Sequence, residues 1–247
     1  MQSKLQSKII KVNNLQYNGI KMQTFKKYIT IIEKNKNDFS PKNTSVEKIL
    51  KIAPWLKDAD TTDAIIGIKS NRIVWYNGTW NNGTWKDGIW ESGTWEDGTW
   101  EDGIWINGSW NNGTWKDGIW KRGTWKDGTW KNGSWRNGIW KDGTWNNGTW
   151  HDGIWKDGIW KSGIWRDGTW EDGTWKDGTW VKGTWDDGTW NNGTWYNGTW
   201  NNGTWHGDIW HNGTWKNGTW NNGTWIKGSW KNGTWKSKKN LRPDKRK

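Results

Sequence analysis

Tryptophan recurs at every fifth position through most of this 247-residue chain. It occupies position 75 and each fifth residue as far as 235, and the repeating unit reads Trp-x-[Asn/Asp]-Gly-[Thr/Ile/Ser]. Glycine fills its position in 31 of the 32 units; the exception is Gly207-Asp208, where glycine and the acidic residue have changed places. A five-residue period excludes an α-helix, because successive tryptophans would spiral around every face of it.

Each position of the unit predicts local structure. Asn-Gly and Asp-Gly favour a tight bend, since both residues tolerate positive φ. Thr, Ile and Trp favour extended strands. The unit therefore predicts a three-residue strand, [Thr/Ile]-Trp-x, followed by a two-residue bend. Strand alternation places Trp on one face and both Thr and x on the other.

Two all-β architectures satisfy this pattern. In the first, every bend is a hairpin turn, and the chain forms an antiparallel meander ribbon with all tryptophans on one face. That face would expose far more apolar surface than a soluble monomer usually shows. In the second, each bend turns the corner of a coil, and strands of successive coils stack in parallel as a β-solenoid with a Trp-filled lumen. We favour the solenoid.

The segment Gly78-Thr79-Trp80-Asn81-Asn82 places a small residue two positions before a large one, as do the units that follow. This frame resembles the pentapeptide-repeat family, right-handed four-sided β-helices in which both residues point inward. The resemblance covers residues 75–236 and implies a β-solenoid, although Gly replaces Ala, Trp replaces Leu or Phe, and Asn/Asp follows the large residue. It extends loosely to uncharacterised repeat runs in phage and large-virus proteins.

The number of units in each coil stays open at this point. Four units per coil, as in that family, would give eight coils. Ile89, Ile104 and Ile119 recur every fifteen residues instead, which suits three units per coil.

The flanking segments predict different structure. Helical spacing of apolar residues predicts a helix over 24–35, and Thr44-Ser45-Val46-Glu47 is a capping box before a short helix over 46–53. Residues 1–63 therefore form a small N-terminal region with helices. Two strands within 64–74 cap the first coil, because solenoids need atypical ends. Residues 237–247 are a basic tail that we expect to be disordered.

Charge and composition narrow the function. The net charge of +12 lies at the two ends: residues 1–74 carry +8 and the tail +5, whereas the array carries −1. The absence of Cys excludes disulfides and cysteine-ligated metals. No apolar run is long enough for a membrane span or a secretory signal. We therefore expect a cytoplasmic or virion protein that does not contact membranes.

Candidate chemistry is sparse. His151, His206 and His211 are the only histidines, and all three occupy the x position. His206 and His211 lie one unit apart and would share a metal only if they converged; we expect surface residues. Asp alternates with Asn before Gly, which indicates a turn former and not a catalytic acid. Ile interrupts the outward Thr positions eight times, so we expect no Thr-only face. The sequence predicts no enzyme, no cofactor and no metal site.

These observations predict a non-enzymatic structural rod or scaffold, a component of a virion or other assembly that contacts other subunits or itself. One alternative is a cell-surface or glycan-binding module, although only Tyr76 and Tyr196 place an aromatic ring in the x position. The other alternative is nucleic-acid attachment, in which the basic ends neutralise phosphates without reading bases. The candidate binding residues are Lys238, Lys239, Arg242, Lys245, Arg246 and Lys247.

Overall fold

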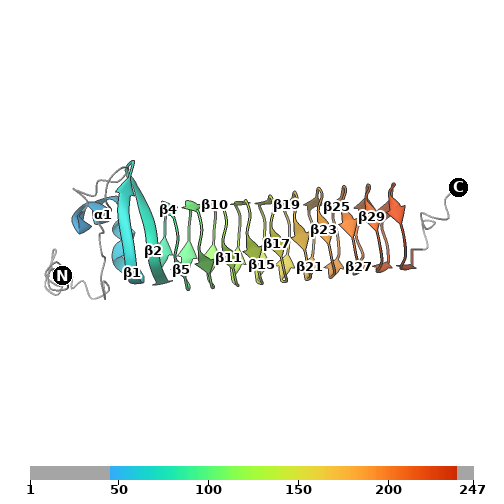
Figure 1. Ribbon diagram of the computed structural model, residues 1–247, viewed down its shortest axis with the longest axis horizontal. Coiled ribbons are helices and arrows are strands. Elements are labelled where there is room, and N and C mark those ends of the chain that lie inside the picture. Colours follow the sequence, from blue (N-terminus) through green and yellow to red (C-terminus); the bar gives the residue numbers. More distant parts are fainter. Residues whose placement is uncertain (1–44, 238–247) are drawn as a thin grey trace, which may run out of the picture.

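The computed structural model describes residues 45–237, and its repeat array is a parallel β-solenoid drawn out into a straight rod (Figure 1). After β2 (Arg72–Asn82), one two-residue strand follows in every unit, from β3 (Thr84–Trp85) to β33 (Thr234–Trp235). Each of these short strands consists of the Trp and the residue before it. The predicted all-β solenoid with a Trp-filled interior is confirmed.

One coil contains three units, so the four-unit coil is wrong and the fifteen-residue period of isoleucine indicated the correct number. Every strand of the repeat array pairs in parallel with the strand fifteen residues away; for example, Trp120 lies beside Trp105 and Trp135. One side of the rod is a separate 11-stranded sheet, which sets the number of coils at eleven. Three indole rings fill the cross-section of each coil, which is the physical reason that a fourth unit is not needed.

The interior consists of three columns of stacked indole rings. Columns A, B and C begin at Trp75, Trp80 and Trp85 and continue every fifteen residues. In column B, the ring centroids of Trp140 and Trp155 are 4.7 Å apart with planes only 6° from parallel. Rings of neighbouring columns meet edge to face, as Trp150 and Trp155 do at 6.0 Å and 73°. Both geometries are favourable for aromatic pairs, and a ring in the middle of the array packs against four others.

The Asn/Asp-Gly bends form the corners between the columns. At Gly158 the backbone has φ +114°, and an added Cβ would lie 2.5 Å from the carbonyl oxygen of Gly143, one coil earlier. The side-chain oxygen of Asp157 accepts a hydrogen bond from the Gly158 N–H at 2.6 Å. Asn137 does the same for Gly138. The bend thus needs glycine for its dihedral angle and for the close approach of successive coils, and Asp and Asn are equivalent in it, as predicted.

The N-terminal end of the rod is capped. Helix α1 (Val46–Ile52) and the 3-10 helix η2 (Pro54–Asp58) cover the first coil, and the Trp55 ring packs against that of Trp85 at 5.0 Å. Strand β1 (Asp60–Lys69) pairs antiparallel with β2 along the first strand edge. Ser45 is the helix N-cap and accepts from the Lys48 N–H, which places the cap one residue after that of the predicted capping box. The predicted helix over 24–35 lies outside the described residues.

Candidate functional site: the outer faces of the rod

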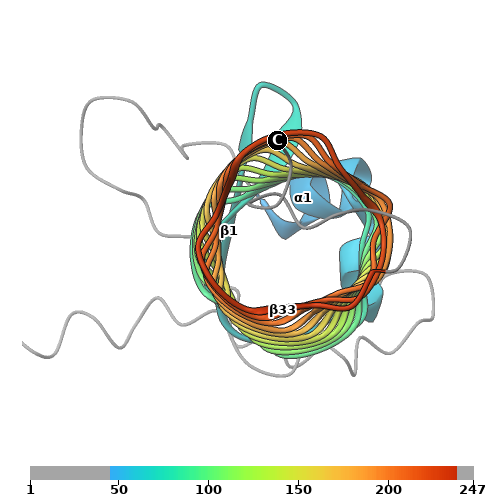
Figure 2. The same ribbon diagram turned by 90° about the vertical axis from the view of Figure 1, so that its right-hand side faces the viewer.

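Along the array the tryptophans are not available to a ligand, so a site there must lie on the outside of the rod; only Trp55 in the N-terminal cap and Trp230 and Trp235 in the last coil are partly exposed among the described tryptophans. Every Trp from 75 to 220 is fully buried. The residues before and after each Trp point outward, and we call these the pre-Trp and free positions. Face A comprises these two positions beside column A, and faces B and C those beside columns B and C. Seen end on, the coils form a closed tube and successive coils are rotated slightly about its axis (Figure 2).

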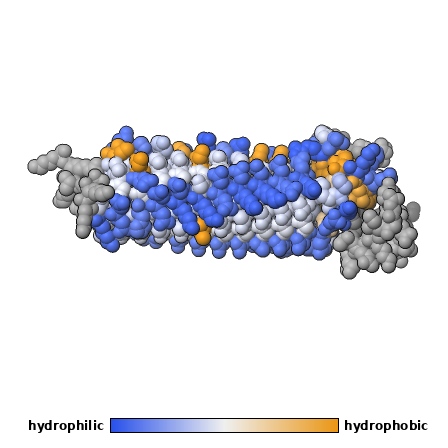
Figure 3. Space-filling view, turned by 180° about the vertical axis from the view of Figure 1, so that it is seen from behind, coloured by the Kyte–Doolittle hydropathy of each residue, from blue (hydrophilic) through white to orange (hydrophobic). Residues whose placement is uncertain are grey.

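Face C carries a nearly continuous ladder of threonines. Its pre-Trp position is Thr in ten of eleven coils, and only Ile159 interrupts the series. The threonines are in register between coils, as Thr99 is with Thr84 and Thr114. No face is Thr-only, as expected, but seven of the eight isoleucines lie on faces A and B, so face C is interrupted only once. Bands of residues of intermediate hydropathy run along the rod between hydrophilic bands (Figure 3).

Faces B and C are lined by charged residues that pair along the rod. Lys, Asp or Glu occupies the free position in eight of eleven coils on face B and in seven on face C. Some of these residues form ion pairs across one coil, as Lys116 does with Glu101 at 3.1 Å and Lys156 with Glu171 at 3.3 Å. These side chains are well exposed, so each pair contributes at most about 1 kcal/mol to stability.

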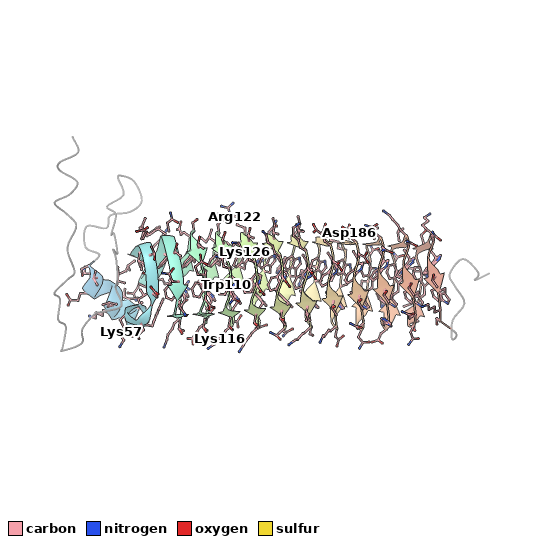
Figure 4. All side chains as sticks on the ribbon, turned by 90° about the horizontal axis from the view of Figure 1, so that it is seen from below. Lys57, Trp110, Lys116, Arg122, Lys126 and Asp186 are labelled. Carbon is pink, nitrogen blue, oxygen red and sulfur yellow. The ribbon has the colours of Figure 1, made fainter. Side chains whose placement is uncertain are left out.

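Face A has a different composition. Glu91 and Lys121 are its only Lys, Asp or Glu residues in the free position. All five apolar or aromatic free-position residues of the array lie here: Tyr76, Ile106, Val181, Tyr196 and Ile226. The array contains three arginines. Arg136 and Arg166 occupy free positions of face A, and Arg122 lies at the bend that follows this face. In Figure 4, Arg122 and Lys116 project from opposite sides of the rod, whereas Trp110 lies inside it.

The tertiary structure perturbs a few ionisable groups on and beside face A. Partial burial, followed by the charge of Glu91, raises the pKa of Tyr76 to about 12. Asp167 lies at the corner between faces A and B. Partial burial acts to raise its pKa, but hydrogen bonds from Lys182 and the Gly168 N–H outweigh the effect of burial, and the net shift of the pKa is downward. Lys182 and Asp167 form an ion pair of 2.7 Å. These contacts tie neighbouring coils together.

The three histidines do not converge. His206 lies on face C and His211 on face A, where its ring stacks on that of Tyr196 at 4.7 Å. His151 lies on face A between Arg136 and Arg166. Burial, and then the charges of these two arginines, lower the pKa of His151. Within residues 45–237, no three His, Cys, Asp or Glu side chains are placed to hold a metal ion.

The N-terminal end of the rod has one surface feature besides the three faces. An open groove at the N-terminal cap lies between α1 and the β1–β2 hairpin and is lined by Lys48, Lys51, Trp55 and Arg72 among others. Arg72 is already engaged there, because it donates to Asp87 at 2.7 Å. The six basic tail residues predicted to bind nucleic acid lie outside the described residues. No helix among residues 45–237 is long and apolar enough to cross a bilayer.

Comparison with known proteins finds no match: no family model matches the chain, and neither a curated protein nor a solved structure is similar to it.

Proposed function

We propose that this chain is a non-enzymatic structural rod that acts as a stiff element of a larger protein assembly. The observation that carries the proposal is the construction of the interior, in which three stacked indole columns run the length of the rod without a break. A chain that bound ligands through its tryptophans would leave rings exposed. Here the aromatic residues support the shape of the rod.

The backbone supports the same role. In the coil after Trp150, six N–H groups donate to carbonyls of the preceding coil, those of His151, Ile154, Lys156, Ile159, Lys161 and Ile164. Distances in this ladder are short, such as 2.8 Å from the Lys156 nitrogen to the Trp140 oxygen. Because each coil contacts only its neighbours, stability and length both grow with the number of coils. A rod of eleven coils spans about 50 Å at ~4.8 Å per coil.

The test varies the length of the rod in its source organism. Deletion of residues 136–180 removes three whole coils and shortens the rod by about 14 Å while preserving the tryptophan period. A matched control exchanges residues 136–150 with 166–180, which changes the order of surface residues but not the length. A structural rod predicts that the assembly changes dimensions, or fails, only with the shortened chain. An assembly of unchanged dimensions would contradict the role.

The glycan-binding and nucleic-acid-binding alternatives stay predictions. The two free-position tyrosines lie on one face but eight coils apart, a separation of about 38 Å. The described surface carries two small groups of exposed rings, the Tyr196–His211 pair and the partly exposed Trp230 and Trp235 of the last coil, and no row of rings along the rod that would favour a glycan over an assembly role.

A further inference from the structure

Face A presents an exposed apolar strip with two arginines, Arg136 and Arg166, on a largely hydrophilic rod. Of the six large apolar side chains that are clearly exposed, four lie on this face: Ile164 at 40%, Val181 at 37%, Tyr196 at 47% and Ile226 at 50%. The other two, Ile154 and Ile159, occupy the pre-Trp positions of faces B and C just before Ile164. The apolar residues therefore gather on one side over many coils.

This composition is typical of a protein–protein interface. Interfaces are enriched in aromatic residues and Arg and depleted in Lys, Glu and Asp. Face A shows both trends relative to faces B and C, although all three faces share the same backbone and the same repeat. Because the free position tolerates almost any residue, nothing in the fold itself requires the difference. The sorting of residues onto face A therefore needs a reason outside the single rod.

We propose that face A binds face A of a second copy of this chain, with the two rods side by side and pointing in the same direction. The inference rests on the proposed function, since it names the partner through which the rod enters an assembly. Eleven strands at ~4.8 Å and a strand width of about 10 Å give a face of about 500 Å². Two such faces bury about 1,000 Å², which reaches the lower limit for a specific interface.

The charged residues of face A favour a parallel over an antiparallel arrangement of the two rods. In an antiparallel pair the fifth coil lies opposite the seventh, so Arg136 would face Arg166 of the other copy, and like charges in an interface are costly. In a parallel pair, a two-fold axis along the rods places each free position opposite the pre-Trp position of the same coil. Arg136 then faces Ser134, and His151 faces Thr149. Long side chains lie over short ones, and no two charged side chains are directly opposed.

The parallel pair also suits the shape of the rod. Successive coils are rotated slightly about the axis, so face A winds gently around the rod (Figure 2). Two rods joined along it would wind around each other and keep the faces in contact. The N-terminal caps of both copies would lie at the same end of the pair.

The first experiment measures dimerisation by analytical ultracentrifugation of the full chain. The double variant Val181→Lys/Tyr196→Lys places two charges on face A, and Asn191→Lys/His206→Lys places two charges on face C in the same two coils. Lysine already occupies the free position after twelve of the 33 tryptophans of the array, so both variants are expected to fold. We expect a dimer for the wild type and the face C variant, and a dissociation constant raised at least tenfold for the face A variant. A monomeric wild type, or equal weakening by both variants, would overturn the proposal.

The second experiment reads the direction of the pair. The chain has no Cys, so single substitutions give unique thiols. Ile226→Cys, Lys231→Cys and Lys236→Cys place one thiol on faces A, B and C at the same end of the rod. A short bis-maleimide should link two copies only through Cys at 226. In an antiparallel pair these thiols would be about 48 Å apart, so the absence of a link there would overturn the proposed arrangement.

The third experiment separates the interface from the rod. Deletion of residues 151–155 removes one unit, keeps the tryptophan period, and turns every later face onto the next side of the rod. Deletion of 151–165 removes a whole coil and leaves face A continuous. Both variants should remain rods by small-angle X-ray scattering, which is the property that the proposed function needs. Only the five-residue deletion should weaken the dimer at least tenfold; equal dimerisation of the two would refute the role of a continuous face A.

Discussion

Removal of one central indole ring is the most direct test of the packing that holds the rod together. Trp155 is fully buried, stacks on Trp140 and Trp170 at 4.7 and 4.8 Å, and meets Trp150 and Trp160 edge to face at 6.0 Å. A buried indole hides roughly 200 Å², which corresponds to about 5 kcal/mol of transfer free energy. Alanine retains part of this, and the unfolded chain already buries some of it. We therefore expect Trp155→Ala to cost about 3–5 kcal/mol.

The assay is equilibrium urea unfolding followed by far-ultraviolet circular dichroism. Because each coil contacts only its neighbours, a gap in mid-array should also weaken the coupling between the two halves, so a single transition should broaden or split. Lys156→Ala is the matched control, since it shortens the adjacent outward side chain and removes only the exposed ion pair with Glu171, so it should change stability by at most about 1 kcal/mol. If Trp155→Ala unfolds with the wild-type midpoint and instead loses affinity for a ligand, the packing role of the tryptophans is refuted.

The remaining predictions concern the bends and one histidine. Gly158→Val should lower the melting temperature far more than Lys156→Val, because a Cβ at Gly158 would clash with the Gly143 backbone; equal melting temperatures would refute this assignment. In the swapped bend at Gly207-Asp208, the distance from the Ile209 nitrogen to the Gly193 oxygen is lengthened to 3.5 Å. Exchanging these two residues to restore the usual order should therefore stabilise the rod by about 1 kcal/mol, measured by urea unfolding. Unchanged stability would show that the bend tolerates both orders. In an NMR titration, the pKa of His151 should lie below its ordinary value of 6.5, and Arg136→Asn should raise it, because a neighbouring positive charge disfavours the protonated ring. The folded state favours the neutral ring of His151, so the contribution of this ring to stability is lost as the pH falls below 6.5, the ordinary pKa of histidine. A titration midpoint of His151 at or above 6.5 would contradict this.

Sequence alone determined the class of fold because the repeat constrains the backbone at every position. An unbroken five-residue period with Asn/Asp-Gly bends permits only short strands joined by tight turns. The glycine of each bend was predicted to adopt positive φ, and the structure shows this at Gly158, together with a close approach of Gly143 that leaves no room for a side chain. Asp157 and Asn137 were predicted to be equivalent turn formers, and both accept from the following glycine. These features are local, so the sequence displays them directly.

Tertiary structure decided how the units close into a coil, because closure depends on how indole rings fill a cross-section and not on any single unit. Three rings meet edge to face and leave no room for a fourth, a relation between residues such as Trp150, Trp155 and Trp160 that propensities do not contain. That number in turn fixes which outward residues share a face. With three units per coil, Val181, Tyr196 and Ile226 align on face A, whereas with four they would fall on different sides. The candidate interface therefore became visible only once the coil was known.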